Sequence, residues 1–330
     1  MKDATALERL AQWPHVSLAQ LPTRLLRADR LGHALGAEPL YVKMDAETGF
    51  ALGGNKVRKL EFALAANQIA GVSCLITAGG PQSNHCRVTA AFAARNGLRC
   101  ILVTNGDVPD PPTGNARLHR LFGAEIVTVP ERADRAPGMV QVAERVSAEG
   151  GTPLIVPIGA STGLGSLGYA RAAVELAEQL DELDDGCDET ILFSSSSSGG
   201  TLAGLVLGLA ILGRTDVRLL GISADSPARE LQTTSLEIAA DGARLLETAP
   251  DLTAVPFVTL DDQVGEGYGI PTAASIAATS TFGATAGIVL DPTYTSKAAA
   301  GMMAWAAEHG LSPHQRLVFL HTGGAPGLLT

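Results

Sequence analysis

The chain has 330 residues, of which 46% are hydrophobic and only 4% aromatic, and its formal net charge is -10. This length and apolar content suffice for one large α/β unit or two domains with buried cores. The acidic balance argues against nucleic acid as a partner and against binding to an anionic membrane surface. The segment MKDATALERL at the start lacks the apolar core of a signal peptide, and no apolar run is long enough to span a bilayer. We therefore expect a soluble cytoplasmic protein.

Short apolar runs alternate with amphipathic stretches along most of the chain. The apolar runs predict strands at 38–45, 74–79, 99–104, 124–129, 153–157, 189–194, 217–223 and 316–321. The periodic stretches predict helices at 56–70, 84–96, 114–123, 136–149, 165–181, 200–213, 271–282 and 296–309. Alternation of this kind predicts parallel sheets with right-handed crossovers, in two α/β units that meet near Gly163. The Pro/Gly/Asp-rich segment 104–115 is expected to be a surface loop.

The four cysteines form no CxxC pair, and the seven histidines show no HExxH or similar ligand spacing. We expect free thiols in a reducing compartment and no metal site.

A lysine follows a double glycine in the segment Gly53-Gly54-Asn55-Lys56. The glycines allow a ligand to approach the backbone, and Asn55 is a good helix cap. A cation in the first turn of a helix opposes the helix dipole, which disfavours the ammonium form and helps the amine act as a nucleophile or base. Taken alone, however, this segment is more simply interpreted as a basic turn that caps a helix.

Four polar side chains, Gln82 to His85, follow Gly79-Gly80 where a predicted strand gives way to a helix. Ligands of parallel α/β sheets bind beyond the carboxyl ends of strands, so these side chains can line a pocket. Ser83 or Asn84 can equally cap the helix, and both roles are compatible.

The serine-rich segment SSSSSGGT, residues 194–201, lies between a buried strand and an apolar helix. A Gly/Ser loop at a helix N-terminus presents several backbone N–H groups and the positive end of the dipole, which together favour an anion. The segment lacks the lysine of a P-loop, and no GxGxxG motif follows an early strand. A monoester phosphate is the ligand that fits best.

Two further turns complete the set. Tyr268 and Tyr294, two of the four tyrosines, each lie in a turn that opens a helix, and His321-Thr-Gly-Gly324 ends the last strand. No carboxylate pair, Ser-His-Asp order or metal cluster competes with this group of polar turns.

Six segments resemble, in order, the D-cysteine desulfhydrase / 1-aminocyclopropane-1-carboxylate deaminase family: GGNKVRKLE, GGPQSNH, SSGGTLAGL, GYGIP, LDPTYTSKAAAGM and HTGGAPGL. These are fold-type II pyridoxal-phosphate enzymes of the tryptophan synthase β superfamily, and the resemblance runs from Leu21 to the C-terminus. It implies two three-layer α/β domains with mostly parallel twisted sheets and the cofactor in the cleft between them. The large domain would comprise 1–56 with 166–330, and the small domain 57–165. The resemblance also implies a homodimer.

The resemblance implies a role for each matched residue. Lys56 would carry pyridoxal 5'-phosphate as a Schiff base and take the α-proton of the substrate. The other cofactor contacts would be Lys59 and the loop Ser198, Gly199, Gly200 and Thr201 at the phosphate, Asn84 at the 3-oxygen and Thr295 at the pyridine nitrogen. The substrate would be held by Gln82, Ser83, Asn84, His85, Tyr268 and Tyr294, of which Ser83 and the two tyrosines also take part in catalysis.

Thr295 departs from the deaminase members, which have a glutamate at this position. A carboxylate keeps the pyridine protonated and makes the ring a strong electron sink, whereas a neutral hydroxyl does so poorly. Elimination of a good β-leaving group needs less of that sink than cyclopropane opening does. The sequence therefore predicts α,β-elimination from a small β-substituted amino acid, with D-cysteine first and L-cysteate second. The alternatives are cyclopropane deamination, a non-catalytic protein that binds a phosphorylated metabolite, and a nicotinamide oxidoreductase.

Overall fold

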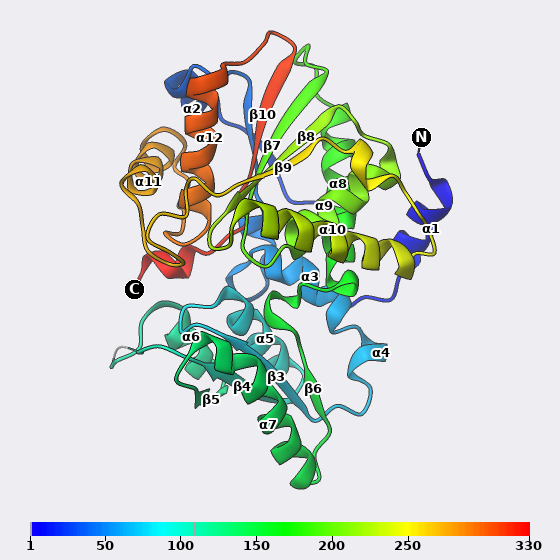
Figure 1. The fold of residues 1–330 in the computed structure, drawn as a ribbon, viewed down its shortest axis with the longest axis vertical. Helices are drawn as coiled ribbons and strands as arrows, with labels where there is room; N and C mark the ends of the chain where they lie inside the picture. The colour runs from blue at the N-terminus through cyan, green and yellow to red at the C-terminus, as the bar shows by residue number, and fades with distance from the viewer. Residues whose placement is uncertain (1, 109) are drawn as a thin grey trace.

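The computed structural model describes residues 2–108 and 110–330, and Figure 1 shows that it contains two separate sheets, one in each half of the molecule. The larger sheet has the strand order β1 (Leu25–Arg27), β2 (Leu40–Lys43), β10 (Gln315–Leu320), β7 (Glu189–Ser196), β8 (Val217–Ser223) and β9 (Phe257–Leu260). All neighbours are parallel except β1, which runs antiparallel to β2. The last strand of the chain therefore lies in the middle of the sheet.

The smaller sheet is wholly parallel, in the order β5 (Glu125–Thr128), β4 (Arg99–Thr104), β3 (Cys74–Gly79) and β6 (Pro153–Ile155). The helices that belong to this half are α5 (Asn84–Arg95), α6 (Gly114–Leu121) and α7 (Arg135–Ala148). The central strands β3 and β4 are almost entirely buried, which explains their continuous apolar sequence.

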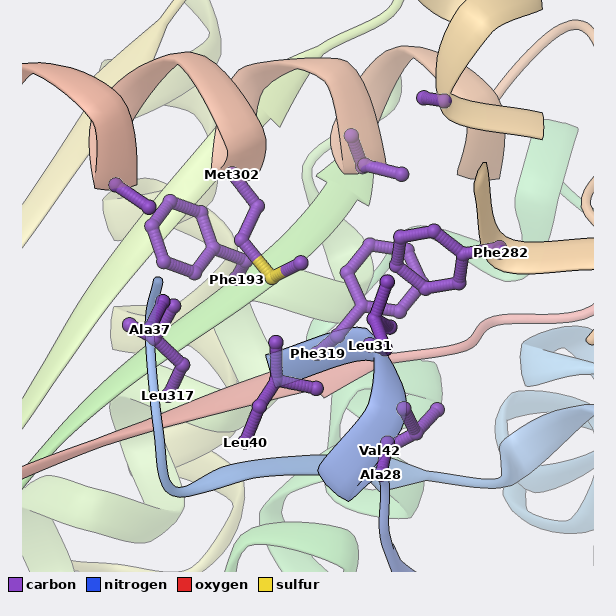
Figure 2. Close-up of a cluster of buried hydrophobic side chains, with 14 of the residues drawn as sticks. Ala28, Leu31, Ala37, Leu40, Val42, Phe193, Phe282, Met302, Leu317 and Phe319 are labelled. Atoms are coloured by element: carbon purple, nitrogen blue, oxygen red, sulfur yellow. The ribbon is translucent and has the colours of Figure 1, made fainter. Parts of the chain in front are cut away.

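Helices cover both faces of the larger sheet. On one face lie α2 (Asp29–Leu35), α11 (Ala273–Ala286) and α12 (Thr295–His309), over the core that Figure 2 shows. There the rings of Phe282 and Phe319 meet edge to face with centroids 5.1 Å apart, a favourable aromatic geometry. On the other face lie α8 (Gly163–Asp181), α9 (Gly200–Leu212) and α10 (Ala228–Leu245). The helix α9 has apolar residues on all sides because it is buried on all sides.

The helix α3 (Asn55–Ala63) joins the two halves. It packs so closely on α8 that a Cβ added to Gly168 would lie 2.1 Å from the carbonyl oxygen of Arg58. The short helix α4 (Ala66–Ile69) follows, and α1 (Ala4–Gln12) packs on the outside of α8 and α9.

The predicted fold class is confirmed, and every predicted strand is present with bounds shifted by a few residues. The predicted helix 56–70 is wrong as a single helix, because the fully buried Leu64 and Ala65 separate α3 from α4. The elements α1, β1, α2, α10 and β9 were not predicted. The predicted surface loop 104–115 has no regular structure from 105 to 113 within the described residues, and residue 109 lies outside them. None of the described helices combines the length and apolar character needed to cross a membrane.

Candidate active site

Lys56 lies in the first turn of α3, which begins directly after two glycines that fix the path of the backbone. Gly53 and Gly54 have φ angles of 66° and 106°, and a Cβ on Gly53 would lie 2.1 Å from the carbonyl oxygen of Ala46. Only glycine fits such a turn. The Lys56 side chain is half-buried, and this burial lowers its pKa to about 8. A sizeable fraction of the amine is therefore neutral, and nucleophilic, near physiological pH.

A pocket surrounds Lys56 and takes its walls from both halves of the molecule. Its lining residues are Asn55, Lys56, Asn84, Ser195, Ser196, Ser197, Ser198, Thr201, Tyr294, Thr322 and Gly323. Apart from Lys56 and Gly323, these residues contribute only amide or hydroxyl side chains. They lie at or just beyond the carboxyl ends of β7 and β10 or at the starts of helices, where ligands of parallel sheets bind.

One side of this pocket is an anion cradle, formed by Lys59, Ser161, Ser198 and the start of α9. The Lys59 ammonium donates to Ser161 Oγ at 2.8 Å, and the Oγ atoms of Ser161 and Ser198 are 2.7 Å apart. A Cβ on Gly200 would lie 2.7 Å from both Lys59 Nζ and Ser161 Oγ, so only glycine leaves room there. Burial, and then the neighbouring Lys56, lower the pKa of Lys59, and an anion in the cradle would offset both effects.

Ser161 was missed by the sequence analysis. It follows β6 in the polar turn before α8, and this strand-to-helix position could have identified it.

The amide of Asn84 is held in one orientation by a buried clamp. Asn84 Oδ1 accepts hydrogen bonds from Arg87 (2.7 Å) and from the Asn115 amide (2.8 Å), which leaves its own NH2 group free to donate into the pocket. Asn115 also donates its backbone N–H to Gln82 Oε1, and Arg87 donates to the carbonyl oxygen of Gly53. The clamp therefore links the Gln82–Asn84 turn to the glycine turn before Lys56. The sequence analysis predicted neither Arg87 nor Asn115 as part of the site.

Ser83 and His85 have different surroundings. Ser83 caps α5 by accepting from the N–H of Cys86, and it also lines a second cavity beside the pocket. His85 is buried and donates from Nε2 to Thr77 Oγ1 at 2.8 Å, because the Thr77 hydroxyl itself donates to a backbone carbonyl. Burial, and then the nearby lysines, lower the pKa of His85, so the imidazole is neutral. His85 is not among the described residues that line either cavity.

Tyr268 and Tyr294 meet at the junction of the two cavities. Their hydroxyls are hydrogen-bonded to each other, and their rings pack edge to face with centroids 5.8 Å apart. Burial, and then the Tyr268 hydroxyl, raise the pKa of Tyr294, so this phenol is protonated at neutral pH. A protonated phenol at this place can donate a proton or a hydrogen bond to a group in the pocket.

Thr295 is fully buried in the first turn of α12, where it interacts with a local carboxylate. Thr295 Oγ1 lies 2.7 Å from Asp291 Oδ1, and the backbone N–H of Asp291 donates to the same hydroxyl. Two hydroxyls that do line the pocket are Ser195 and Thr322, whose oxygen atoms are 3.0 Å apart. The turn that contains Thr322 was expected to suit a ligand; Ser195 lies in the segment 194–201 that was expected to bind an anion, but no contact was predicted for Ser195 itself.

A buried ion network stands behind α3. Arg58 donates twice to Asp45 at 2.8 Å and twice to Glu175 at 2.9 and 3.0 Å, and Tyr169 donates to Asp45 at 2.7 Å. Lys43 also pairs with Glu175. The network anchors the helix that carries Lys56 to the larger sheet and to α8.

Comparison with known proteins gives a consistent result. Residues 16–323 match the family described as pyridoxal-phosphate dependent enzyme. A D-cysteine desulfhydrase of Salmonella newport is 36% identical over 332 residues, which cover 98% of this chain and 97% of the relative. The crystal structure of an ACC deaminase homologue superposes with a TM-score of 0.88 at 31% identity, covering 99% of this chain and 96% of the other. Diaminopropionate ammonia lyase of Escherichia coli has a TM-score of 0.67 at 16% identity, over 99% of this chain and 89% of the other, and shares the fold.

Proposed function

Because the chain belongs to the pyridoxal-phosphate dependent enzymes, we propose that it is a lyase that removes a β-substituent from a small amino acid, with D-cysteine as the first substrate to test. The products would be pyruvate, ammonia and, from cysteine, sulfide. The observation that carries this proposal is the position of Lys56, a lysine with a lowered pKa in the same pocket as an anion cradle.

The residues of the pocket fit the cofactor. Lys59, Ser161, Ser198 and the N–H groups at the start of α9 form a donor set for a phosphate, and the space at Gly200 would be filled by any side chain. Lys56 is the amine that would hold the aldehyde carbon. When bound, pyridoxal phosphate supplies an electron sink that weakens the bonds at the α-carbon.

The residues around the cofactor would orient the substrate and move its protons. We propose that Lys56, once displaced from the cofactor, takes the α-proton, as its lowered pKa permits. Asn84, oriented by its clamp, would donate to the 3-oxygen. Gln82 and Ser83 would hold the substrate carboxylate, with Tyr294 beside the reacting carbons.

The pyridine nitrogen would meet a hydroxyl rather than a carboxylate. Thr295 remains our proposed contact by resemblance, and Ser195 and Thr322 line the pocket as well. Asp291, the nearby carboxylate, already accepts from Thr295 Oγ1 and from three backbone N–H groups. A neutral partner at the ring nitrogen favours elimination over cyclopropane opening.

The test is product analysis on the purified protein. D- and L-cysteine, L-cysteate, D-serine and 1-aminocyclopropane-1-carboxylate would be supplied separately, and pyruvate, 2-oxobutyrate and ammonia measured. We expect pyruvate from a β-substituted amino acid, and its loss in a Lys56→Ala variant but not in the exposed control Lys2→Ala. Formation of 2-oxobutyrate alone would establish the deaminase alternative, and failure to take up pyridoxal phosphate would refute the proposal altogether.

We further propose a cytoplasmic homodimer in which 57–165 forms the small domain and the rest of the chain the large one. The four-stranded sheet lies entirely within 57–165, and none of the four cysteines is in a disulfide in the described structure, which support the division and the compartment. The homodimer is supported by the family resemblance, and light scattering on the purified protein would test it.

A further inference from the structure

Two arginines lie close together at the start of α7, and their surroundings differ. Arg132 pairs with Asp225, with one N–O distance of 2.9 Å, and its guanidinium lies 5.3 Å from the centre of the Tyr268 ring. This pair joins the turn before α7 to the turn after β8, so the N-terminal end of α7 faces the larger sheet. The side chain of Arg135, the first residue of α7, has no hydrogen-bond partner and no carboxylate within 4.0 Å among residues 2–108 and 110–330. Its Nε atom is buried and unpaired.

Arg135 lies next to Gly80, a residue that lines the second cavity. Its NH2 group is 3.4 Å from the point that a Cβ on Gly80 would occupy. Gly80 lines the second cavity together with Ser83, Tyr268 and Tyr294, and this cavity shares Asn84 and Tyr294 with the pocket around Lys56. Because Gly80 has no side chain, the guanidinium closely approaches this part of the cavity lining.

The position is unfavourable for a cation unless an anion joins it. A positive charge in the first turn of a helix opposes the helix dipole, which disfavours it there. Burial, and then the charge of Arg132, lower the pKa of Arg135, so nothing nearby stabilises its charged form enough to offset these effects. Half-buried charges are normally paired, and an unpaired one beside a substrate cavity suits a charge that the substrate brings.

The proposed function already gives the α-carboxylate of the substrate to Gln82 and Ser83. We infer that Arg135 binds a second negative charge, on the β-substituent of the substrate, and so selects amino acids whose leaving group is anionic, such as a sulfonate. This inference rests on the proposed elimination and narrows its substrate class.

The step balances without an oxidant or reductant. With a β-sulfonate, Lys56 takes the α-proton, the bond between the β-carbon and sulfur breaks, and its electron pair leaves with sulfur as sulfite. The released 2-aminoacrylate then reacts with water to give pyruvate and ammonium. Arg135 would hold the departing group as its charge increases from one to two, so its attraction strengthens along the reaction.

The experiment compares one anionic substrate with one neutral substrate in four proteins. The proteins are the wild-type holoenzyme, Arg135→Leu, Arg135→Lys and the control Arg145→Leu, which removes an exposed arginine from the same helix. The substrates are cysteate, as separate enantiomers, and D-cysteine. We expect Arg135→Leu to lower kcat/KM for cysteate by about 10- to 100-fold, because one charge-assisted hydrogen bond is lost. The same variant should change kcat/KM for D-cysteine by less than about twofold. Arg135→Lys should restore part of the loss, and Arg145→Leu should match the wild type.

A second readout does not depend on turnover. Calorimetry with 3-sulfopropanoate, which lacks the amino group, should show binding to the wild type, weaker binding to Arg135→Leu, and weakening of the wild-type interaction by salt. If Arg135→Leu lowers kcat/KM equally for cysteate and D-cysteine, the arginine acts on the α-carboxylate or supports the fold, and the inference is overturned. It is also overturned if Arg135→Leu changes neither value. If no amino acid is turned over by the wild type, the proposed function fails, and the sulfopropanoate result still decides whether Arg135 binds an anion.

Discussion

The substitution Gly200→Ala tests the anion cradle by filling it with one methyl group. Gly200 is the first residue of α9 and does not have a positive φ, so alanine can adopt its backbone conformation. The added Cβ would lie 2.7 Å from Lys59 Nζ and from Ser161 Oγ, and 2.8 Å from Ser161 Cα. The ammonium can swing away, but the backbone of Ser161 cannot, so the variant should lose the contact between Lys59 and a bound phosphate.

The expected size of the effect follows from that contact. A hydrogen bond between charged groups contributes about 1.5–3 kcal/mol, and each 1.4 kcal/mol is a factor of ten in affinity. We therefore expect the Kd for pyridoxal phosphate to rise by about 10- to 100-fold. The measurement is a titration of apo-protein in a Lys56→Ala background, so that the covalent link does not mask the contribution of the phosphate.

Gly283→Ala is the matched control. This glycine lies within α11, and a Cβ there would meet no described atom within 4 Å. Alanine should leave cofactor affinity unchanged and stabilise the helix slightly. If Gly200→Ala binds the cofactor as tightly as Gly283→Ala does, the residues around Gly200 do not form the phosphate site.

Three further predictions concern the surroundings of the pocket. Asp45→Asn removes one of the two carboxylates that pair with the buried Arg58 guanidinium, and urea unfolding should show a loss of about 3–5 kcal/mol, whereas the exposed Asp181→Asn should leave the midpoint nearly unchanged. Burial alone would raise the pKa of Asp45, but its arginine partner outweighs burial and lowers it. The stability it contributes should therefore be complete above its unfolded pKa of about 3.9 and disappear as the pH falls through the lower folded value, a dependence that Asp45→Asn should lack. The rate at which apo-protein captures pyridoxal phosphate, measured by stopped-flow absorbance, should rise with pH because the neutral Lys56 amine reacts. The midpoint of this rise should be about 8, and a midpoint near 10 would contradict the burial of Lys56. Asn115→Ala should lower kcat/KM by about 10- to 100-fold because it removes the side-chain amide that donates to Asn84 Oδ1 and to the carbonyl oxygen of Gln82, while the exposed Asn67→Ala should not.

The sequence predicted those parts of the site that depend on local pattern. The glycine turn before Lys56 precedes a helix start, and the serine loop before α9 combines a strand end with a helix start; the structure places the two together around one pocket. Their signals are short-range, since glycines, caps and helix polarity act over a few residues. The same pattern places Tyr294 correctly at a turn that opens a helix.

The contacts that orient these residues come from distant segments and have no local signature. Asn115 reaches Gln82 and Asn84 from a helix about thirty residues further along the chain, and Glu175 reaches Arg58 across more than a hundred. No periodicity connects such positions. The missed helix α10 has a mixed composition in which polar residues interrupt the apolar stripe, and the missed strand β9 is a four-residue edge strand. Tertiary packing rather than local propensity determines elements of this kind.

The central place of β10 also affects how the protein is made. A ribosome releases the N-terminal strands β1 and β2 some 270 residues before the strand that joins them to β7. Until β10 has emerged, the larger sheet is in two pieces, and the pocket lacks Thr322 and Gly323. The smaller sheet, by contrast, is complete once β6 has been synthesised. A chain that stops before residue 315 can therefore complete one sheet but not the cofactor pocket, and the full lining of the pocket is available only once Gly323 has been added.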